Sequence, residues 1–182
     1  MPVAAHSEDL LARARRIRLA CFDVDGTLTD GRLHFDDEGR EHKAFHAQDG
    51  LGLAQLRRFG IEVALITARK SRVTEIRGAE LGLTEVHTAA KDKLATTRAI
   101  AGRLGIGMDE TAFMGDDLVD LGVFPHVALA VAPADAHPWT APHAHWITPR
   151  PGGHGAARDF CDLLLEAQGH RAAVLAAFGV AS

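Results

Sequence analysis

The chain has 182 residues, of which 47% are hydrophobic and 24% charged, and its formal net charge is −4 at pH 7. This length and apolar content predict one domain with a sizeable core, and the acidic balance argues against a nucleic-acid or membrane partner. Cys21 and Cys161 lie far apart without the spacing of a zinc site or a disulfide framework, and neither a membrane span nor a signal peptide is evident. We therefore expect a cytoplasmic protein.

Short apolar runs alternate with segments of helical period along the chain, a pattern typical of helices on both faces of a mostly parallel sheet. The runs predict strands at residues 17–22, 61–67, 83–87, 111–115 and 127–131. Helices are predicted at residues 51–59, 72–81, 94–104 and 156–167. Asp49 is the expected N-cap of the first helix, and Ser71 of the second. The fold class is therefore a three-layer, Rossmann-like α/β domain.

One segment interrupts the alternation between the first strand and the first helix. Residues 32–35 and 40–45 have extended character and flank a turn cluster at residues 36–39. They predict a β-hairpin that stands close to the end of the first strand. It forms either one wall of a site or an ordinary surface hairpin.

Chemically active residues follow the predicted strands, where open α/β sheets bind ligands. Asp23 and Asp25 come directly after the first strand, and Gly26 allows a turn. Asp23 is the candidate nucleophile, because a carboxylate can attack phosphorus when a divalent cation neutralises the phosphate. Asp25 is the candidate acid and base, which protonates the leaving alkoxide and later activates water. This pair predicts a two-step hydrolysis of a phosphate monoester.

Further polar residues follow the later strands. The hydroxyl of Thr67 can bond a phosphoryl oxygen, and the Lys93 ammonium can hold Asp23 and the phosphate together. Asp116 is expected to bind Mg²⁺ with Asp23 and the backbone oxygen of Asp25, supported by Asp120, since this cation prefers oxygen ligands. Each residue alone is weak evidence, whereas the ordered set predicts a magnesium-dependent phosphatase.

The four motifs DVDGT, Thr67, Lys93 and GDDLVD resemble those of the haloacid dehalogenase (HAD) superfamily of phosphohydrolases. The segments KAFHAQDGLG, LITARK and GGHGAARDFCDLLLEAQG further resemble the KdsC/YrbI family, which releases Kdo from 3-deoxy-D-manno-octulosonate 8-phosphate for lipopolysaccharide synthesis. The resemblance covers residues 20–169 and implies an uncapped HAD fold with a hairpin flap. It divides the chain into a helical extension at 1–16, a phosphatase domain at 17–169 and a tail at 170–182.

The resemblance also implies roles for individual residues. Asp23, Asp25, Thr67 and Lys93 would be catalytic, and Asp23, Asp25 and Asp116 would hold Mg²⁺. The implied substrate contacts are Asp25, His46, Ala47, Gln48, Asp49, Gly50, Arg69, Arg77, Lys93 and Asp117. His46, Gln48 and Ala54 depart from the family pattern, whereas Arg69 favours Kdo 8-phosphate because a related nonulosonic acid 9-phosphate phosphatase has glutamate there.

The spacing between motifs leaves no room for a cap domain, because the intervals from Asp23 to Thr67 and from Thr67 to Lys93 are filled by predicted elements. An open site offers few contacts for selecting a small sugar. Family members form homotetramers, and the resemblance implies that the hairpin or the apolar ending RAAVLAAFGVAS covers a neighbouring subunit's site. A frayed terminus is the alternative for that ending.

Other functions compete with hydrolysis of a sugar phosphate such as Kdo 8-phosphate. A nonulosonic acid 9-phosphate would use the same chemistry on another substrate. A signalling receiver domain also uses an aspartyl-phosphate, although Asp25 favours turnover over a stable phosphoprotein. A silent binding domain would lack hydrolysis, and a metal site at His137, His143 and His145 lacks acidic or cysteine partners at suitable spacing.

Overall fold

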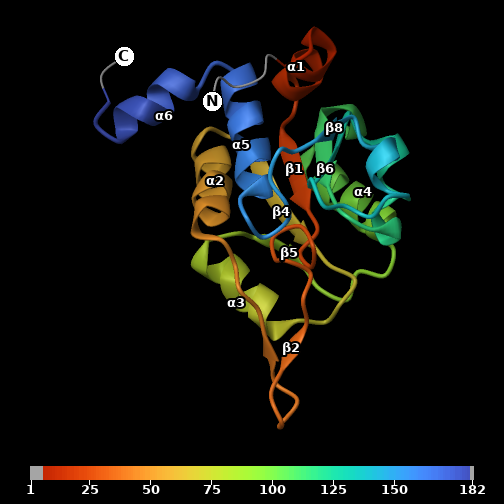
Figure 1. Ribbon diagram of the computed structural model, residues 1–182. Helices are drawn as coiled ribbons and strands as arrows, with labels where there is room; N and C mark the ends of the chain where they lie inside the picture. Colours follow the sequence, from red (N-terminus) through yellow and green to blue (C-terminus); the bar gives the residue numbers. More distant parts are fainter. Residues whose placement is uncertain (1–5, 181–182) are drawn as a thin grey trace.

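The computed structural model describes residues 6–180, which form a six-stranded parallel sheet and a separate two-stranded hairpin (Figure 1). The sheet order is β5-β4-β1-β6-β7-β8. Its strands are β1 (Leu19–Phe22), β4 (Glu62–Ile66), β5 (Glu85–His87), β6 (Thr111–Met114), β7 (Leu129–Ala132) and β8 (Trp146–Ile147). The five strands predicted from apolar runs are present, and the α/β fold is confirmed.

Helices cover both faces of this sheet. They are α1 (Glu8–Arg15), α2 (Ala47–Arg58), α3 (Arg72–Glu80), α4 (Lys93–Leu104), α5 (Ala156–Ala167) and α6 (Arg171–Ala177). Side chains of Ser71 and Asp92 accept hydrogen bonds from backbone N–H groups in the first turns of α3 and α4. Gly105 ends α4 in the left-handed conformation that its sequence position predicts.

The alternation of side chains along β1 divides the interior into two cores. Ala20 and Phe22 face α2 and α5, where Phe22 packs against Phe160 with 5.4 Å between ring centroids. Leu19 and Cys21 face the other way, toward α4. Figure 1 shows α2 and α5 on one side of the sheet and α4 on the other. Both faces of β1 are therefore buried, as its uninterrupted apolar sequence requires.

Several details differ from the sequence-based expectation, and one is that helix α6 forms within the segment expected to be a tail. Helix α2 begins at Ala47 after His46, because the His46 carbonyl already accepts a helical hydrogen bond from Gly50. Asp49, the expected N-cap, instead accepts a hydrogen bond from the Arg158 backbone of α5 at 2.7 Å. Strand β8 was not predicted, since it has only two residues and lies among prolines and histidines.

The connections leave the carboxyl edge of the sheet open. The chain runs from β1 to β4 and β5, and then crosses to β6 on the other side of β1. The direction of strand addition therefore reverses between β1 and β6, and in open α/β sheets ligands bind beyond the strand ends at such a point. Residues 23–93 hold only the hairpin β2 (His34–Phe35) and β3 (Glu41–His42), α2, β4, α3 and β5, so no cap domain is inserted there. No helix in residues 6–180 is long and apolar enough to cross a membrane.

Phe160→Ala tests the core between β1 and α5. Removing this fully buried ring should lower the free energy of unfolding by about 3–5 kcal/mol, because it leaves a cavity beside Phe22. Trp139→Ala is the control, since that aromatic ring is 70% exposed, and should change stability by less than about 0.5 kcal/mol. Urea denaturation of both variants checks this, and equal losses would contradict the assigned core.

Candidate active site

A buried cluster of charged groups lies at the carboxyl edge, where β1, β6 and α4 meet. Asp23 directly follows β1, Asp116 comes two residues after β6, and Lys93 is the first residue of α4. Lys93 Nζ lies 2.9 Å from Asp23 Oδ1 and 2.6 Å from Asp120 Oδ1. Carboxylate oxygens of Asp23, Asp116 and Asp120 all lie within 4.8 Å of one another. The structure thus brings together residues that are 97 positions apart in the sequence.

The cluster holds more negative than positive charge. Burial first, and then repulsion by Asp120, raise the pKa of Asp23 to about 8, although Lys93 opposes the shift. Burial and Asp120 likewise raise the pKa of Asp116 to about 7. Burial alone would lower the pKa of Lys93, but Asp23 and Asp120 outweigh burial and raise it. Three carboxylates beside one ammonium therefore favour an additional cation.

The carboxylate oxygens of the cluster differ in the hydrogen bonds that they accept from the protein. Asp120 is fully engaged, because Oδ1 accepts from Lys93 and Oδ2 accepts from the backbone N–H groups of Asp116 and Asp117. Asp116 Oδ1 accepts from the Thr27 hydroxyl at 3.2 Å. This leaves oxygens of Asp23 and Asp116 for a hard divalent cation, with Asp120 orienting Lys93 and the Asp116 loop.

Gly26 provides the space that Asp116 occupies. Its φ angle is +89°, and a Cβ atom placed on it would overlap Asp116 Oδ2. A side chain at this position would therefore push the Asp116 carboxylate out of the cluster. The glycine in the D-x-D-G motif is required both by the turn and by the cluster itself.

Asp25 faces the hairpin rather than Lys93. Its Oδ1 accepts a short hydrogen bond from Lys43 Nζ, and its Oδ2 lies 3.7 Å from Arg69 Nε. Arg69 Nη2 also contacts Glu41 at 3.2 Å. Sequence reasoning singled out Arg69 and Asp25 but missed Glu41 and Lys43. The available signal was their i, i+2 spacing, which directs both side chains toward one face of the extended segment.

Thr67 occupies the position that the sequence predicts. It directly follows β4, which pairs with β1, and its side chain is 2% exposed. Its hydroxyl accepts a hydrogen bond from the Arg69 backbone at 3.3 Å. The hydroxyl therefore lies at the same edge as Asp23, although it contributes to the turn before α3.

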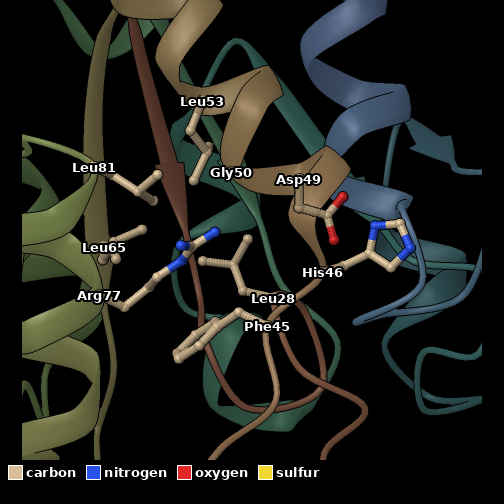
Figure 2. A pocket seen from close by; sticks show the side chains of 9 residues that line it. All are labelled: Leu28, Phe45, His46, Asp49, Gly50, Leu53, Leu65, Arg77 and Leu81. Carbon is tan, nitrogen blue, oxygen red and sulfur yellow. The ribbon is translucent and has the colours of Figure 1, made fainter.

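The remaining candidates divide between a neighbouring pocket and the surface. Figure 2 shows Arg77 extending from α3 toward Gly50, whereas His46 and Asp49 lie together on the other side of the α2 N-terminus. The Arg77 guanidinium lies 5.7 Å from the centre of the Phe45 ring and pairs with Glu80. Three further candidates are exposed at the rim: Ala47, Gln48 and Asp117. Gln48 accepts a hydrogen bond from Arg150, and Asp117 caps the following turn.

Comparisons with known proteins identify a matching family model and relatives that cover most of the chain. A family model described as haloacid dehalogenase-like hydrolase matches residues 70–158. The 3-deoxy-D-manno-octulosonate 8-phosphate phosphatase KdsC of Escherichia coli K12 is 44% identical over 163 residues, which cover 90% of this chain and 87% of that protein. An alignment of this length spans all four motifs.

Solved structures give the same result for the fold. The Yersinia pestis 3-deoxy-D-manno-octulosonate 8-phosphate phosphatase has a TM-score of 0.89 at 41% identity, covering 91% of this chain and 89% of that one. The Moraxella catarrhalis phosphatase, solved with magnesium, phosphate and KDO, has a TM-score of 0.92 at 37% identity and covers 95% of this chain and 99% of that one. Magnesium is thus the cation that the buried carboxylates fit.

Gly26→Ala tests the contact between the turn and Asp116. Displacing Asp116 should abolish most of the thermal stabilisation that Mg²⁺ provides and lower phosphatase activity by roughly a hundredfold. Gly60→Ala is the control, because Gly60 has a φ of +82° but a Cβ atom placed on it would have nothing within 4 Å. Both variants bear a similar backbone cost of about 1–2 kcal/mol, so equal responses to Mg²⁺ would contradict the role of the Asp116 contact.

The raised carboxyl pKa values predict a pH-dependent response to magnesium. Asp23 and Asp116 have folded pKa values of about 8 and about 7, against ordinary values of 3.8. Their contribution to stability is complete below the unfolded pKa and is lost as pH rises through about 7 to 8. Mg²⁺ requires the ionised carboxylates and offsets that loss.

The melting temperature should therefore rise more on adding Mg²⁺ at pH 8 than at pH 6. Differential scanning fluorimetry at both pH values, with and without Mg²⁺, measures the difference. Asp116→Asn is the control and should reduce the increment at pH 8. An increment that is independent of pH would show that these carboxylates do not bind the ion.

Proposed function

The chain belongs to the haloacid dehalogenase-like hydrolases, in the family of the KdsC phosphatases, and on this premise we propose that it hydrolyses 3-deoxy-D-manno-octulosonate 8-phosphate to Kdo and phosphate. The observation that carries the reaction type is the cluster of Asp23, Asp116 and Asp120 around Lys93. The substrate is inferred from the relatives, and it places the enzyme in lipopolysaccharide biosynthesis.

Asp23 acts as the nucleophile in this proposal. One of its oxygens attacks phosphorus, the bond from phosphorus to the sugar oxygen breaks, and the leaving oxygen takes a proton from Asp25. Water then attacks the phosphorus of the aspartyl-phosphate and gives a proton to Asp25. This hydrolysis releases phosphate and restores Asp23. Asp23 and Asp116, with the Asp25 backbone oxygen, would hold Mg²⁺, which supplies neutralisation of the phosphate charge. Lys93 keeps Asp23 oriented beside that charge.

Binding of the substrate uses groups around the cluster. The Thr67 hydroxyl is offered to a phosphoryl oxygen, and Arg69 and Arg77 provide guanidinium groups for the sugar-acid carboxylate. Asp49 and Gly50 line the pocket beside Arg77, together with His46. Ala47, Gln48 and Asp117 lie at the exposed rim, where they are suited to outer contacts with the sugar.

The open site supports a further proposal about assembly. We infer a homotetramer in which the hairpin or the tail covers a neighbouring subunit's site. Both segments present large apolar side chains to solvent: Leu33, Phe35, Leu175, Phe178 and Val180. Such exposure suits a protein contact. The division into residues 1–16, 17–169 and 170–182 remains a prediction, as does the cytoplasmic location that the two free cysteines favour.

Phosphate release from a panel of sugar phosphates tests the function. With Mg²⁺, release should be selective for Kdo 8-phosphate over a nonulosonic acid 9-phosphate, and chelation of the metal should abolish it. Asp23→Asn should lower the rate by roughly a thousandfold or more, because the nucleophile is lost. Preference for the 9-phosphate would replace the substrate and keep the mechanism, whereas no release from any ester would exclude the phosphatase.

A further inference from the structure

Lys43 is a buried lysine at the edge of the candidate site. It lies between β3 and α2, and its side chain is 1% exposed. Its ammonium is paired with Asp25 and, at 3.3 Å, with Glu41. A buried ammonium is costly unless it is paired, so these two carboxylates account for its position. Lys43 is thus held where it contacts the proposed acid and base directly.

The two oxygens of Asp25 have different surroundings. Oδ1 accepts the hydrogen bond from Lys43. Within residues 6–180, the buried Oδ2 has no hydrogen-bond partner, and neither does Arg69 Nε, which lies 3.7 Å from it. One oxygen is therefore fixed by the lysine, while the other is buried beside Arg69 without a hydrogen bond.

Glu41 fixes the other side of Lys43. Its Oε1 contacts Lys43 at 3.3 Å and Arg69 at 3.2 Å, and its Oε2 accepts from the hydroxyl of Ser71, the N-cap of α3. Burial opposes ionisation of Glu41, but the Ser71 hydrogen bond and the charges of Lys43 and Arg69 outweigh it and hold the pKa of the carboxyl below its usual range. Two carboxylates and two cations therefore form a balanced ring that joins the hairpin, α3 and the Asp25 loop.

We propose that Lys43 is a positioning residue that holds Asp25 Oδ1 and thereby sets the orientation of the carboxylate that gives and takes the proton. The inference rests on the proposed phosphatase reaction with Asp25 as acid and base. Asp25 takes up a proton from solvent before the first step, and in that step the proton moves to the sugar oxygen as the bond from this oxygen to phosphorus breaks. In the second step the Asp25 carboxylate accepts a proton from the water that attacks the aspartyl-phosphate. Both transfers require one fixed orientation of the Asp25 carboxylate.

A comparison of two leaving groups distinguishes the loss of a correctly positioned acid from a general loss of active-site structure. A sugar alkoxide needs the proton from Asp25, whereas p-nitrophenolate leaves at neutral pH without one. The ratio kcat/KM reports the steps up to formation of the aspartyl-phosphate. Loss of a correctly oriented acid should therefore lower kcat/KM for the sugar phosphate and spare it for p-nitrophenyl phosphate. Hydrolysis of the aspartyl-phosphate still needs the base, so this step should become rate-limiting for p-nitrophenyl phosphate, whose first step is unaffected.

Lys43→Met is the test, with Kdo 8-phosphate and p-nitrophenyl phosphate as substrates and Asp25→Asn as the benchmark. We expect kcat/KM for Kdo 8-phosphate to fall about 100-fold and that for p-nitrophenyl phosphate by less than about threefold. A rapid burst of p-nitrophenol, about one per active site, should precede slow turnover. Lys70→Met, at an exposed lysine after β4, is the matched control and should behave as the wild type.

Equal losses for the two substrates, or no loss for either, would overturn the positioning role of Lys43. Removing one cation from a balanced ring can unfold the protein, so Glu41→Gln with Lys43→Met provides a charge-balanced variant that should show the same selectivity between leaving groups. A wild-type protein that releases phosphate from neither ester would instead reject the phosphatase itself. An active wild type with a non-selective Lys43→Met loss rejects only the inference about Lys43.

Discussion

The ion pairs of Lys93 with Asp23 and Asp120 are the interaction on which the site depends. Asp23, Asp116 and Asp120 approach within 4.8 Å beyond the ends of β1 and β6, and their repulsion in a buried position would be severe without a cation. Lys93 can lie there because Asp92 begins α4 at this point. Asp120 can pair with Lys93 through Oδ1 because backbone N–H groups donate hydrogen bonds to its Oδ2. The helix start and the loop after β6 are therefore parts of one electrostatic arrangement.

Two sets of charges with different balances meet at this edge of the sheet. The cluster around Lys93 has three carboxylates and one ammonium, and this excess of negative charge favours Mg²⁺. The ring of Asp25, Glu41, Lys43 and Arg69 has two of each sign and is balanced without an added ion. Such a division suits chemistry that needs a metal at the phosphate and a proton carrier at the leaving group. In the proposed reaction, the hairpin stem would help to position Asp25 as well as form one wall of the site.

The sequence predicted the fold and the central cluster because both depend on short-range patterns. Apolar runs mark the strands, and Asp23, Lys93 and Asp116 follow predicted element boundaries, so parallel topology alone brings them to one edge. The start of α2 was misplaced because Asp49 looks like a cap but binds the backbone of α5, a contact 109 residues away. Lys43 and Glu41 were missed for a related reason. Their partners lie in other segments, so the hairpin sequence alone does not show whether these two side chains are exposed or are buried in ion pairs. Strand β8 carries too few residues for any period to be recognised.

In the proposed reaction, Arg69 links selection of the substrate to the proton carrier Asp25. The resemblance favours Kdo 8-phosphate at this position, because a related 9-phosphate phosphatase has glutamate there, and the structure places the Arg69 guanidinium between Glu41 and Asp25. A glutamate at this position would leave three carboxylates around the single ammonium of Lys43, which would raise their pKa values and disturb the orientation of Asp25. If Arg69 binds the substrate and Asp25 carries the proton, as proposed, a reversal of charge at position 69 would need a compensating change at Glu41 or at another member of the ring. Specificity and catalysis would then be constrained by the same balance of charge.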